Sequence, residues 1–225
     1  MTSQNEIADV SLKVDHDDPI DTDIAVIGAG IAGLVCAEQL RQAGYGVVVI
    51  EKSRGFGGRA ATKRLPNFRA DHGIRYLARS GRLLPVLIDT LHDRDLLQPW
   101  NVRFCRVTPE GTIQPETLRS TELDSTGVKR YIAPAGANAI GKFLAQALTV
   151  WRSRRAIALS TEEDRWCIQL EAVADGVDAP LSLTARAIVV AVPAPQAAEL
   201  IATTETIAPE IKTAIAAVSY HPVLA

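Results

Sequence analysis

The feature that most constrains the fold of this chain is a set of three glycines at fixed spacing, in Gly28-Ala29-Gly30-Ile31-Ala32-Gly33. A short apolar run, Ile24–Ile27, precedes them and is typical of a buried strand. The apolar spacing from Ile31 to Ala43 predicts a helix directly after them. A strand that turns at once into a helix needs glycine where the backbone turns tightly and where the two elements approach each other.

The residues after this helix complete a strand–helix–strand unit. Gly46–Ile50 is nearly all β-branched, which favours a strand buried on both faces of a parallel sheet, and Glu51 ends it. In such a unit Gly28 permits the turn, Gly30 lets a pyrophosphate approach the backbone, and Gly33 allows close packing of helix on strand. Glu51 follows Gly33 by 18 residues, near the spacing expected of an acid that accepts ribose hydrogen bonds. Two alternative interpretations remain open. In one, the glycines serve only to shape a tight turn; in the other, Glu51 is an ordinary surface acid.

A second glycine cluster follows the acid, in Glu51-Lys52-Ser53-Arg54-Gly55-Phe56-Gly57-Gly58-Arg59. A simple NAD-dependent dehydrogenase does not need a second Gly-Gly-Arg here. FAD is longer, so its pyrophosphate and ribityl chain need further close approach of backbone, and Arg59 can offset phosphate charge with a forked donor. The cluster therefore favours non-covalently bound FAD over NAD.

Further elements follow from the apolar pattern and the turn residues. We expect helices at 83–97, 138–148 and 209–218, a hairpin at 102–114, and strands at 156–161, 166–172 and 183–192. Residues 193–196 should break the last of these strands, and a helix should follow them to about residue 202.

Composition excludes several classes of protein. The chain has 225 residues, 22% of them charged, with a formal net charge of −2, so neither nucleic acid nor an anionic membrane is expected as a partner. The three cysteines are scattered without metal-ligand spacing, which predicts no metal and a reducing, cytoplasmic setting. We read the acid-rich residues 1–22 as a disordered leader and the arginines at 152, 154 and 155 as solvated.

The stretch Asp23–Arg64 resembles the glutathione-reductase-like flavoproteins, the branch that includes amine oxidases, phytoene desaturases and protoporphyrinogen oxidase. Three further stretches resemble the renalase-type family within it. They are Asp71-His72-Gly73-Ile74-Arg75-Tyr76, Tyr131-Ile132-Ala133-Pro134-Ala135-Gly136-Ala137-Asn138-Ala139 and Val189-Val190-Ala191-Val192-Pro193-Ala194-Pro195-Gln196. The resemblance implies an α/β fold: a Rossmann-like FAD domain with a parallel sheet (23–80, 136–161 and 183–200), interleaved with an incomplete α+β substrate domain (81–135 and 201–225).

The same resemblance implies site residues and a reaction. It places Ala156 where the backbone of the family contacts the adenine. It places His72 and Gly73 on the path toward the isoalloxazine. The alternative interpretation of His72 is a polar loop residue without a role in binding. The implied reaction is oxidation of a reduced nicotinamide nucleotide, NAD(P)H or an isomer, by O₂; no catalytic acid or base stands out. One alternative is an amine oxidase-like enzyme, which needs aromatic side chains around its substrate, whereas only 5% of this chain is aromatic. The other alternative is a shortened, non-catalytic chain that binds a nucleotide.

Overall fold

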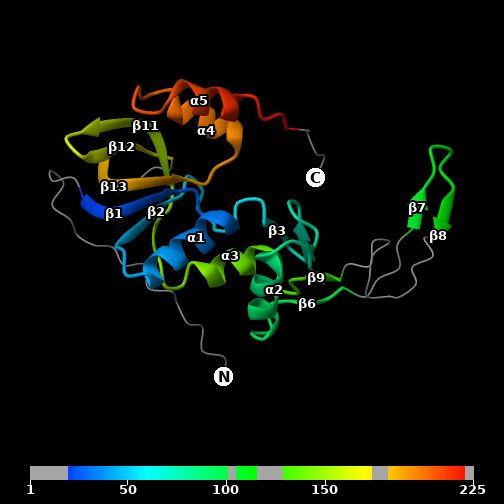
Figure 1. The fold of residues 1–225 in the computed structure, drawn as a ribbon. Coiled ribbons are helices and arrows are strands. Elements are labelled where there is room, and N and C mark those ends of the chain that lie inside the picture. The colour runs from blue at the N-terminus through cyan, green and yellow to red at the C-terminus, as the bar shows by residue number, and fades with distance from the viewer. Residues whose placement is uncertain (1–19, 101–104, 116–128, 174–181, 221–225) are drawn as a thin grey trace. The chain divides into compact units, whose positions relative to one another are not determined.

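Figure 1 shows the computed structural model, which describes residues 20–100, 105–115, 129–173 and 182–220. These residues form two compact units. The first unit comprises the described residues of 1–58 and 141–224, and the second comprises those of 59–140. The chain thus leaves the first unit after Gly58 and returns to it at Gly141.

The first unit is built on a six-stranded sheet in the order β10-β2-β1-β13-β12-β11. Its strands are β1 (Ile20–Ile27), β2 (Val47–Ile50), β10 (Thr149–Trp151), β11 (Arg154–Glu162), β12 (Arg165–Ala172) and β13 (Ser182–Val190). The pairs β10–β2, β2–β1 and β1–β13 are parallel, whereas β12 runs antiparallel to both of its neighbours. The expected α/β fold with a mostly parallel sheet is therefore confirmed.

Helices cover both faces of this sheet, and the two-residue alternation of the strands explains why. Ala25 and Ile27 of β1 join a core with Leu200 of α4 (Ala194–Ile201). Ile24 and Val26 of the same strand face the other way and pack with Leu34 and Ala37 of α1 (Ile31–Gln42). Figure 1 shows α1 on one side of the sheet and α4 with α5 (Pro209–Ala216) on the other. The central strands are apolar at successive positions because both of their faces are buried.

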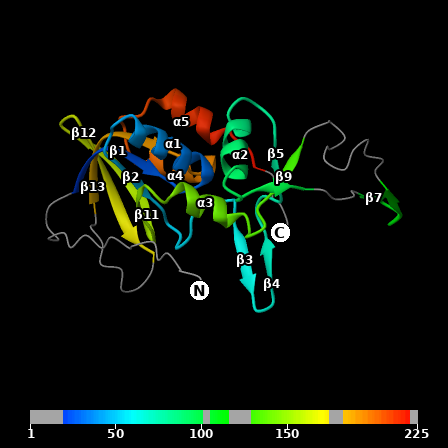
Figure 2. The same cartoon turned by 90° about the horizontal axis from the view of Figure 1, so that it is seen from below.

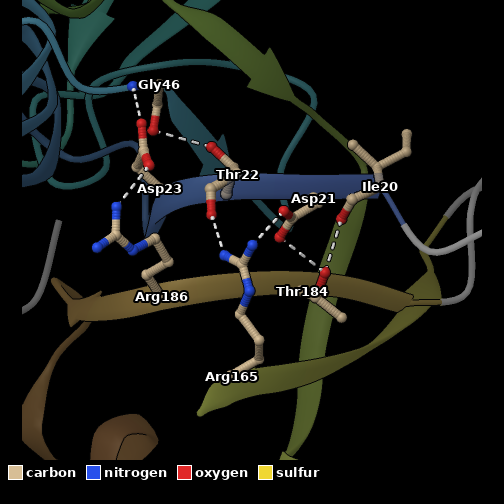
Figure 3. A network of polar contacts seen from close by, with 8 residues as sticks. All are labelled: Ile20, Asp21, Thr22, Asp23, Gly46, Arg165, Thr184 and Arg186. Carbon is tan, nitrogen blue, oxygen red and sulfur yellow. Dashed lines mark hydrogen bonds and ion pairs between the residues drawn. The ribbon is translucent and has the colours of Figure 1, made fainter. Parts of the chain in front are cut away.

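Strand β1 begins at Ile20, not at Asp23, so the expectation that residues 20–22 belong to a disordered leader is wrong. Its first residues pair with Leu183 and Thr184 of β13, and Figure 3 shows acids of β1 facing arginines of β12 and β13. Asp21 pairs with Arg165 of β12, and Asp23 pairs with Arg186 of β13 at 3.5 Å. The acidic composition thus belongs to a charge-paired strand end. Residues 1–19 lie outside the described residues.

The second unit is mixed. It contains a hairpin of β3 (Thr62–Leu65) and β4 (Phe68–Asp71), a three-stranded sheet, a helix and a second hairpin. The three-stranded sheet has the order β5-β9-β6, from Leu77–Ala78, Arg130–Ile132 and Gln98–Pro99. The helix is α2 (Leu84–His92), and the second hairpin pairs β7 (Cys105–Val107) with β8 (Ile113–Pro115).

Several elements differ from those expected in extent. The helix expected over 83–97 ends at His92, because Asp95 adopts a left-handed φ of 57° that a continuing helix does not allow. The helix expected over 138–148 is α3 (Asn138–Leu144), and the residues after it form β10, a strand the pattern did not predict. The β3–β4 hairpin was also missed, because its strands are short and polar.

The compact units do not follow the domain boundaries expected from the sequence. Residues 59–80 lie in the second unit, whereas α5, expected in the substrate domain, lies in the first. Helix α5 stays with α4 because a short turn joins them and Lys212 donates to the carbonyl of Thr204 at 2.6 Å. The assignment of cofactor and substrate roles to parts of the chain stays a prediction.

Candidate functional site

The turn after β1 has the geometry that its first glycine was expected to permit. Gly28 has a φ of 111°, a conformation that side-chain-bearing residues rarely adopt. Its N–H donates to the carbonyl of Ile50 at 2.8 Å, and a Cβ placed here would lie 2.9 Å from the carbonyl oxygen of Ala191. Gly28 is therefore held between the ends of β2 and β13, where only glycine fits.

The two other glycines of the loop have opposite surroundings. A Cβ on Gly33 would lie 2.0 Å from the carbonyl oxygen of Gly28, so this glycine lets α1 sit close against the end of β1. A Cβ on Gly30 would meet no heavy atom within 4 Å. Among the residues that the structure describes, none lies close enough to a Cβ at position 30 to require glycine there. An empty approach to the backbone is what a bound pyrophosphate requires.

The N-terminus of α1 offers the charge that a phosphate needs. Gly30 is the N-cap, so no side chain caps the first turn, and no acidic residue lies in that turn. Ala32 is exposed and Ile31 is half-buried. The first amide groups of a helix have no partner within the helix and carry part of its positive dipole. This 12-residue helix thus presents donors beside the open space at Gly30.

Glu51 is not a surface acid, because its residue is only 8% exposed. Its carboxylate accepts hydrogen bonds from the backbone N–H of Ala29 at 2.8 Å and of Ser53 at 2.7 Å. Two neutral backbone donors hold the buried carboxylate at the first glycine loop. Each carboxylate oxygen has a second lone pair that can accept a ribose hydroxyl.

The structure joins the second glycine cluster to the first. The N–H of Gly57 donates to the carbonyl of Ala29 at 2.8 Å, and Gly30 and Gly57 form a parallel bridge. Gly58 has a φ of 57°, and a Cβ on it would lie 3.1 Å from the Cα of Gly30. The two clusters therefore form one backbone-lined cradle, which we define as residues 28–33, Glu51, Gly57 and Gly58.

Two residues that support the cradle were missed from the sequence. A Cβ on Gly141 of α3 would lie 2.5 Å from the backbone nitrogen of Gly57, so α3 packs directly on the second cluster. Arg152, expected to be solvated, donates to the carbonyl of Arg54 at 3.1 Å and lies over the ring of Phe56 at 5.3 Å. For Gly141, the sequence signal would have been a small residue within an apolar helix. For Arg152 there is no local signal in the sequence, because Arg152 and its partner Arg54 are 98 positions apart.

Lys52 and Ala156 are less defined. Lys52 is exposed at the end of β2. Ala156 is half-buried in β11, packs against the core, and lies where the β11–β12 register shifts. The start of β11 does meet the end of β2, since the N–H of Arg154 donates to the carbonyl of Glu51 at 3.0 Å. A role for either residue in holding a cofactor stays a prediction.

The remaining expected site residues lie in the second unit. Gly73 is packed so closely that a Cβ would lie 1.7 Å from the carbonyl oxygen of Arg59, and that carbonyl accepts the N–H of Ile74 at 2.9 Å. The side chains of Arg59 and His72 are exposed. The structure thus explains why Gly73 is glycine, while cofactor roles for Arg59, His72 and Gly73 stay predictions.

Asp71 has a structural role. Its Oδ1 accepts the hydroxyl of Thr62 and the N–H of Ala137, and the Thr62 oxygen accepts the N–H of Asn138 at 3.1 Å. Two of the stretches with a renalase-type resemblance therefore meet, because the β3–β4 hairpin caps the start of α3. Gly136 fits here with a φ of 96°, since a Cβ on it would meet Thr62 at 2.7 Å.

An aromatic pair in the second unit was also missed. The rings of Tyr76 and Trp100 lie 5.5 Å apart with an interplanar angle of 31°. The guanidinium of Arg130 lies 4.6 Å from the centre of the Tyr76 ring. These residues flank β5, β6 and β9, which bring together segments distant in the sequence. The low aromatic content therefore does not prevent the chain from assembling an aromatic wall.

Comparison with known proteins agrees with this geometry. A family model described as an NAD(P)-binding Rossmann-like domain matches residues 26–91, the region that holds the glycine clusters. The flavin-containing monooxygenase FMO GS-OX-like 2 of Arabidopsis thaliana is 48% identical over 48 residues, which are 21% of this chain and 10% of that protein. The 1-hydroxycarotenoid 3,4-desaturase of Flavobacterium sp. strain P99-3 is 42% identical over 67 residues, or 30% of this chain and 13% of that protein.

Solved structures extend the likeness of fold beyond this region. A triple mutant of putrescine oxidase has a TM-score of 0.67 and 14% identity, and the match covers 87% of this chain and 63% of the oxidase. Cyclohexylamine oxidase from Brevibacterium oxydans IH-35A has a TM-score of 0.65 and 15% identity, with 87% and 63% covered. The chain thus spans less than two thirds of these neighbours and about a tenth of the curated relatives. Within the described residues, no helix is long and apolar enough to span a membrane.

Proposed function

We propose that this chain forms the FAD-binding part of a flavin-dependent oxidoreductase. The observation that carries the proposal is the open approach to Gly30, beside an uncapped helix N-terminus and a second glycine cluster. The residues present fit the cofactor: residues 28–33 would bind the pyrophosphate, Glu51 the ribose, and Gly57 with Gly58 the chain beyond it. The names of the relatives and structural neighbours, which include flavin-containing enzymes and oxidases, support the same class.

The substrate we propose is a reduced nicotinamide nucleotide, NAD(P)H or an isomer, with O₂ as electron acceptor, as in the renalase-type family. FAD, when bound, supplies the capacity to accept a hydride and pass its electrons to O₂. The chain's own task is to bind and orient the cofactor and to exclude water. The hydride transfer proposed here requires no protein acid or base. A cytoplasmic location, suggested by the scattered cysteines, belongs to the same proposal.

Amine oxidation is the second candidate, and one observation favours it. The paired rings of Tyr76 and Trp100 form an aromatic surface on which a cation already rests, the guanidinium of Arg130. Aromatic faces attract cations electrostatically, and a protonated amine has the same charge as that guanidinium. Two structural neighbours are named as oxidases of amines, putrescine and cyclohexylamine.

Flavin content and anaerobic reduction test these proposals together. We expect purified protein to be yellow, with FAD released on denaturation, and to be bleached by NADH, NADPH or their isomers faster than by putrescine or cyclohexylamine. Faster bleaching by the amines would favour the second candidate. Colourless protein that binds NAD would contradict the FAD assignment. Protein that holds FAD but is reduced by none of these compounds would instead support a non-catalytic nucleotide-binding chain.

A further inference from the structure

The β3–β4 hairpin carries a concentration of positive charge that the proposed FAD site does not use. Figure 2 shows the two strands as an extended antiparallel pair. Between Arg59 and Arg75 the chain contains four arginines, at 59, 64, 69 and 75, with Lys63, and Asp71 is the single acid among them. The whole chain has a net charge of −2, so this basic segment differs in charge from the chain as a whole.

The strand register places two of these arginines directly opposite each other. Arg64 pairs with Arg69, and Thr62 pairs with Asp71, two positions along the same face. Side chains opposite each other in an antiparallel pair have Cβ atoms about 5 Å apart, and like charges there destabilise the hairpin. The two guanidinium groups therefore repel each other.

No protein group neutralises this pair within the described part of the chain. Both arginines are exposed, and neither forms an ion pair there. Arg69 donates to the carbonyl of Ala135 at 3.2 Å, which restrains its guanidinium. Asp71, two positions along this face, supplies one negative charge against the two arginines and accepts the hydroxyl of Thr62 and the N–H of Ala137. An anion bound between the two arginines would offset this repulsion.

We propose that Arg64 and Arg69 form a binding site for a phosphomonoester dianion. Each guanidinium can donate two parallel hydrogen bonds to phosphate oxygens, so two opposed arginines match a group with two negative charges. The source is either free phosphate or a phosphate carried by a small molecule such as a nucleotide. The site differs from the cradle at Gly30 and does not depend on the FAD proposal.

The faces of the hairpin favour a small anion over an anionic membrane. Phe68 is 62% exposed, and with Leu65 it would be the apolar anchor for a lipid surface. The register pairs Leu65 with Phe68, and alternation along the strands puts this pair on the face opposite to Arg64 and Arg69. A membrane could therefore not engage the arginine pair and the apolar pair from one side.

Titration calorimetry at constant ionic strength tests the proposal, with inorganic phosphate and 2′-AMP as probes. We expect one site per chain, weakened at least tenfold by Arg64→Gln or by Arg69→Gln. Arg64→Lys keeps the positive charge but cannot donate two parallel hydrogen bonds, so we expect an intermediate loss of affinity. Arg82→Gln removes an exposed arginine of the same unit outside the hairpin and serves as the matched control. Tighter binding of 2′-AMP than of phosphate would identify a carried phosphate as the source, and the reverse would identify free phosphate.

Two further measurements separate this site from the FAD cradle and from misfolding. Gly30→Val should keep phosphate binding, because the hairpin does not include the cradle. Binding of 2′-AMP should strengthen as pH rises through about 6, where the second phosphate proton leaves. Far-UV circular dichroism should show the arginine variants folded. Equal binding by the wild type and both glutamine variants, equal loss in Arg82→Gln, or binding only to phosphatidylserine vesicles would overturn the proposal.

Discussion

The two ends of β1 meet different chemical needs with different residues. At its start, charged and hydroxyl side chains satisfy one another: Arg165 donates to Asp21 and to the carbonyl of Thr22, and Thr184 donates to Asp21 (Figure 3). At its end, glycine replaces side chains, and the exposed groups are backbone donors beside open space. An acid lies beside each end, but only Glu51, which follows β2 and accepts the N–H of Ala29 after β1, is buried.

The difference shows how to separate a structural polar cluster from a binding site. At the start of β1 the protein supplies a partner for each charge, so nothing remains for a ligand to contribute. At the end of β1, within the described residues, no side chain caps α1 and the space beside Gly30 stays open. A site is therefore better identified by donors and space left open than by the number of charged residues.

The largest effect is expected for Gly33→Val at the end of β1. Its Cβ would lie 2.0 Å from the carbonyl oxygen of Gly28, so α1 must move away from the strand. Overpacking against backbone should cost about 3 kcal/mol of the free energy of unfolding, the upper end of the usual range. Urea denaturation followed by circular dichroism measures it. A loss of unfolding free energy below about 1 kcal/mol would show that the end of β1 accommodates a side chain better than its geometry implies.

Gly30→Val should separate binding from stability. A Cβ at position 30 would meet no heavy atom within 4 Å, so we expect the free energy of unfolding to stay within about 0.5 kcal/mol of the wild type. The side chain would occupy the space of the pyrophosphate, so FAD binding should be abolished. Flavin content after purification and flavin titration check the second part. A variant with a full complement of FAD would refute the placement of the site.

Glu51→Ala should have an intermediate effect on both properties. It removes a ribose acceptor and leaves the N–H groups of Ala29 and Ser53 without their partner. We expect FAD binding to weaken by about 1–3 kcal/mol, and the free energy of unfolding to fall by a similar amount. Fluorescence titration of flavin and urea denaturation measure the two losses. Glu38→Ala, at a half-buried position of α1 where the carboxylate pairs with Arg41, is the matched acid control and should change flavin affinity little.

The smallest effect is expected at the start of β1, for the pair Asp21 and Arg165. Their side chains are 50% and 36% exposed, and an exposed ion pair contributes about 0–1 kcal/mol. A double-mutant cycle with Asp21→Asn and Arg165→Gln should yield a coupling in that range, reduced by salt. Flavin affinity should not change in any of the variants. A change in affinity would mean that the two ends of β1 are not independent.

Local patterns predicted the first unit well. The glycine spacing and the apolar runs located β1, α1 and β2, because each of these elements is specified by residues that are neighbours in the sequence. Predictions failed where distant partners decide the outcome. Asp21 was expected in a disordered leader because its ladder partner, Thr184, is 163 positions away, and β10 was missed because three residues become a strand only beside β2.

The sequence by itself determined the first glycine loop, its acid and the class of fold, since these depend on backbone conformations that only certain residues allow. The tertiary structure alone decided how the two glycine clusters join at Gly30 and Gly57, and that Gly141 packs on the second cluster. It also decided that Asp71 caps α3, while Arg64 and Arg69 oppose each other. These facts depend on register and packing between segments far apart along the chain, which no local pattern encodes.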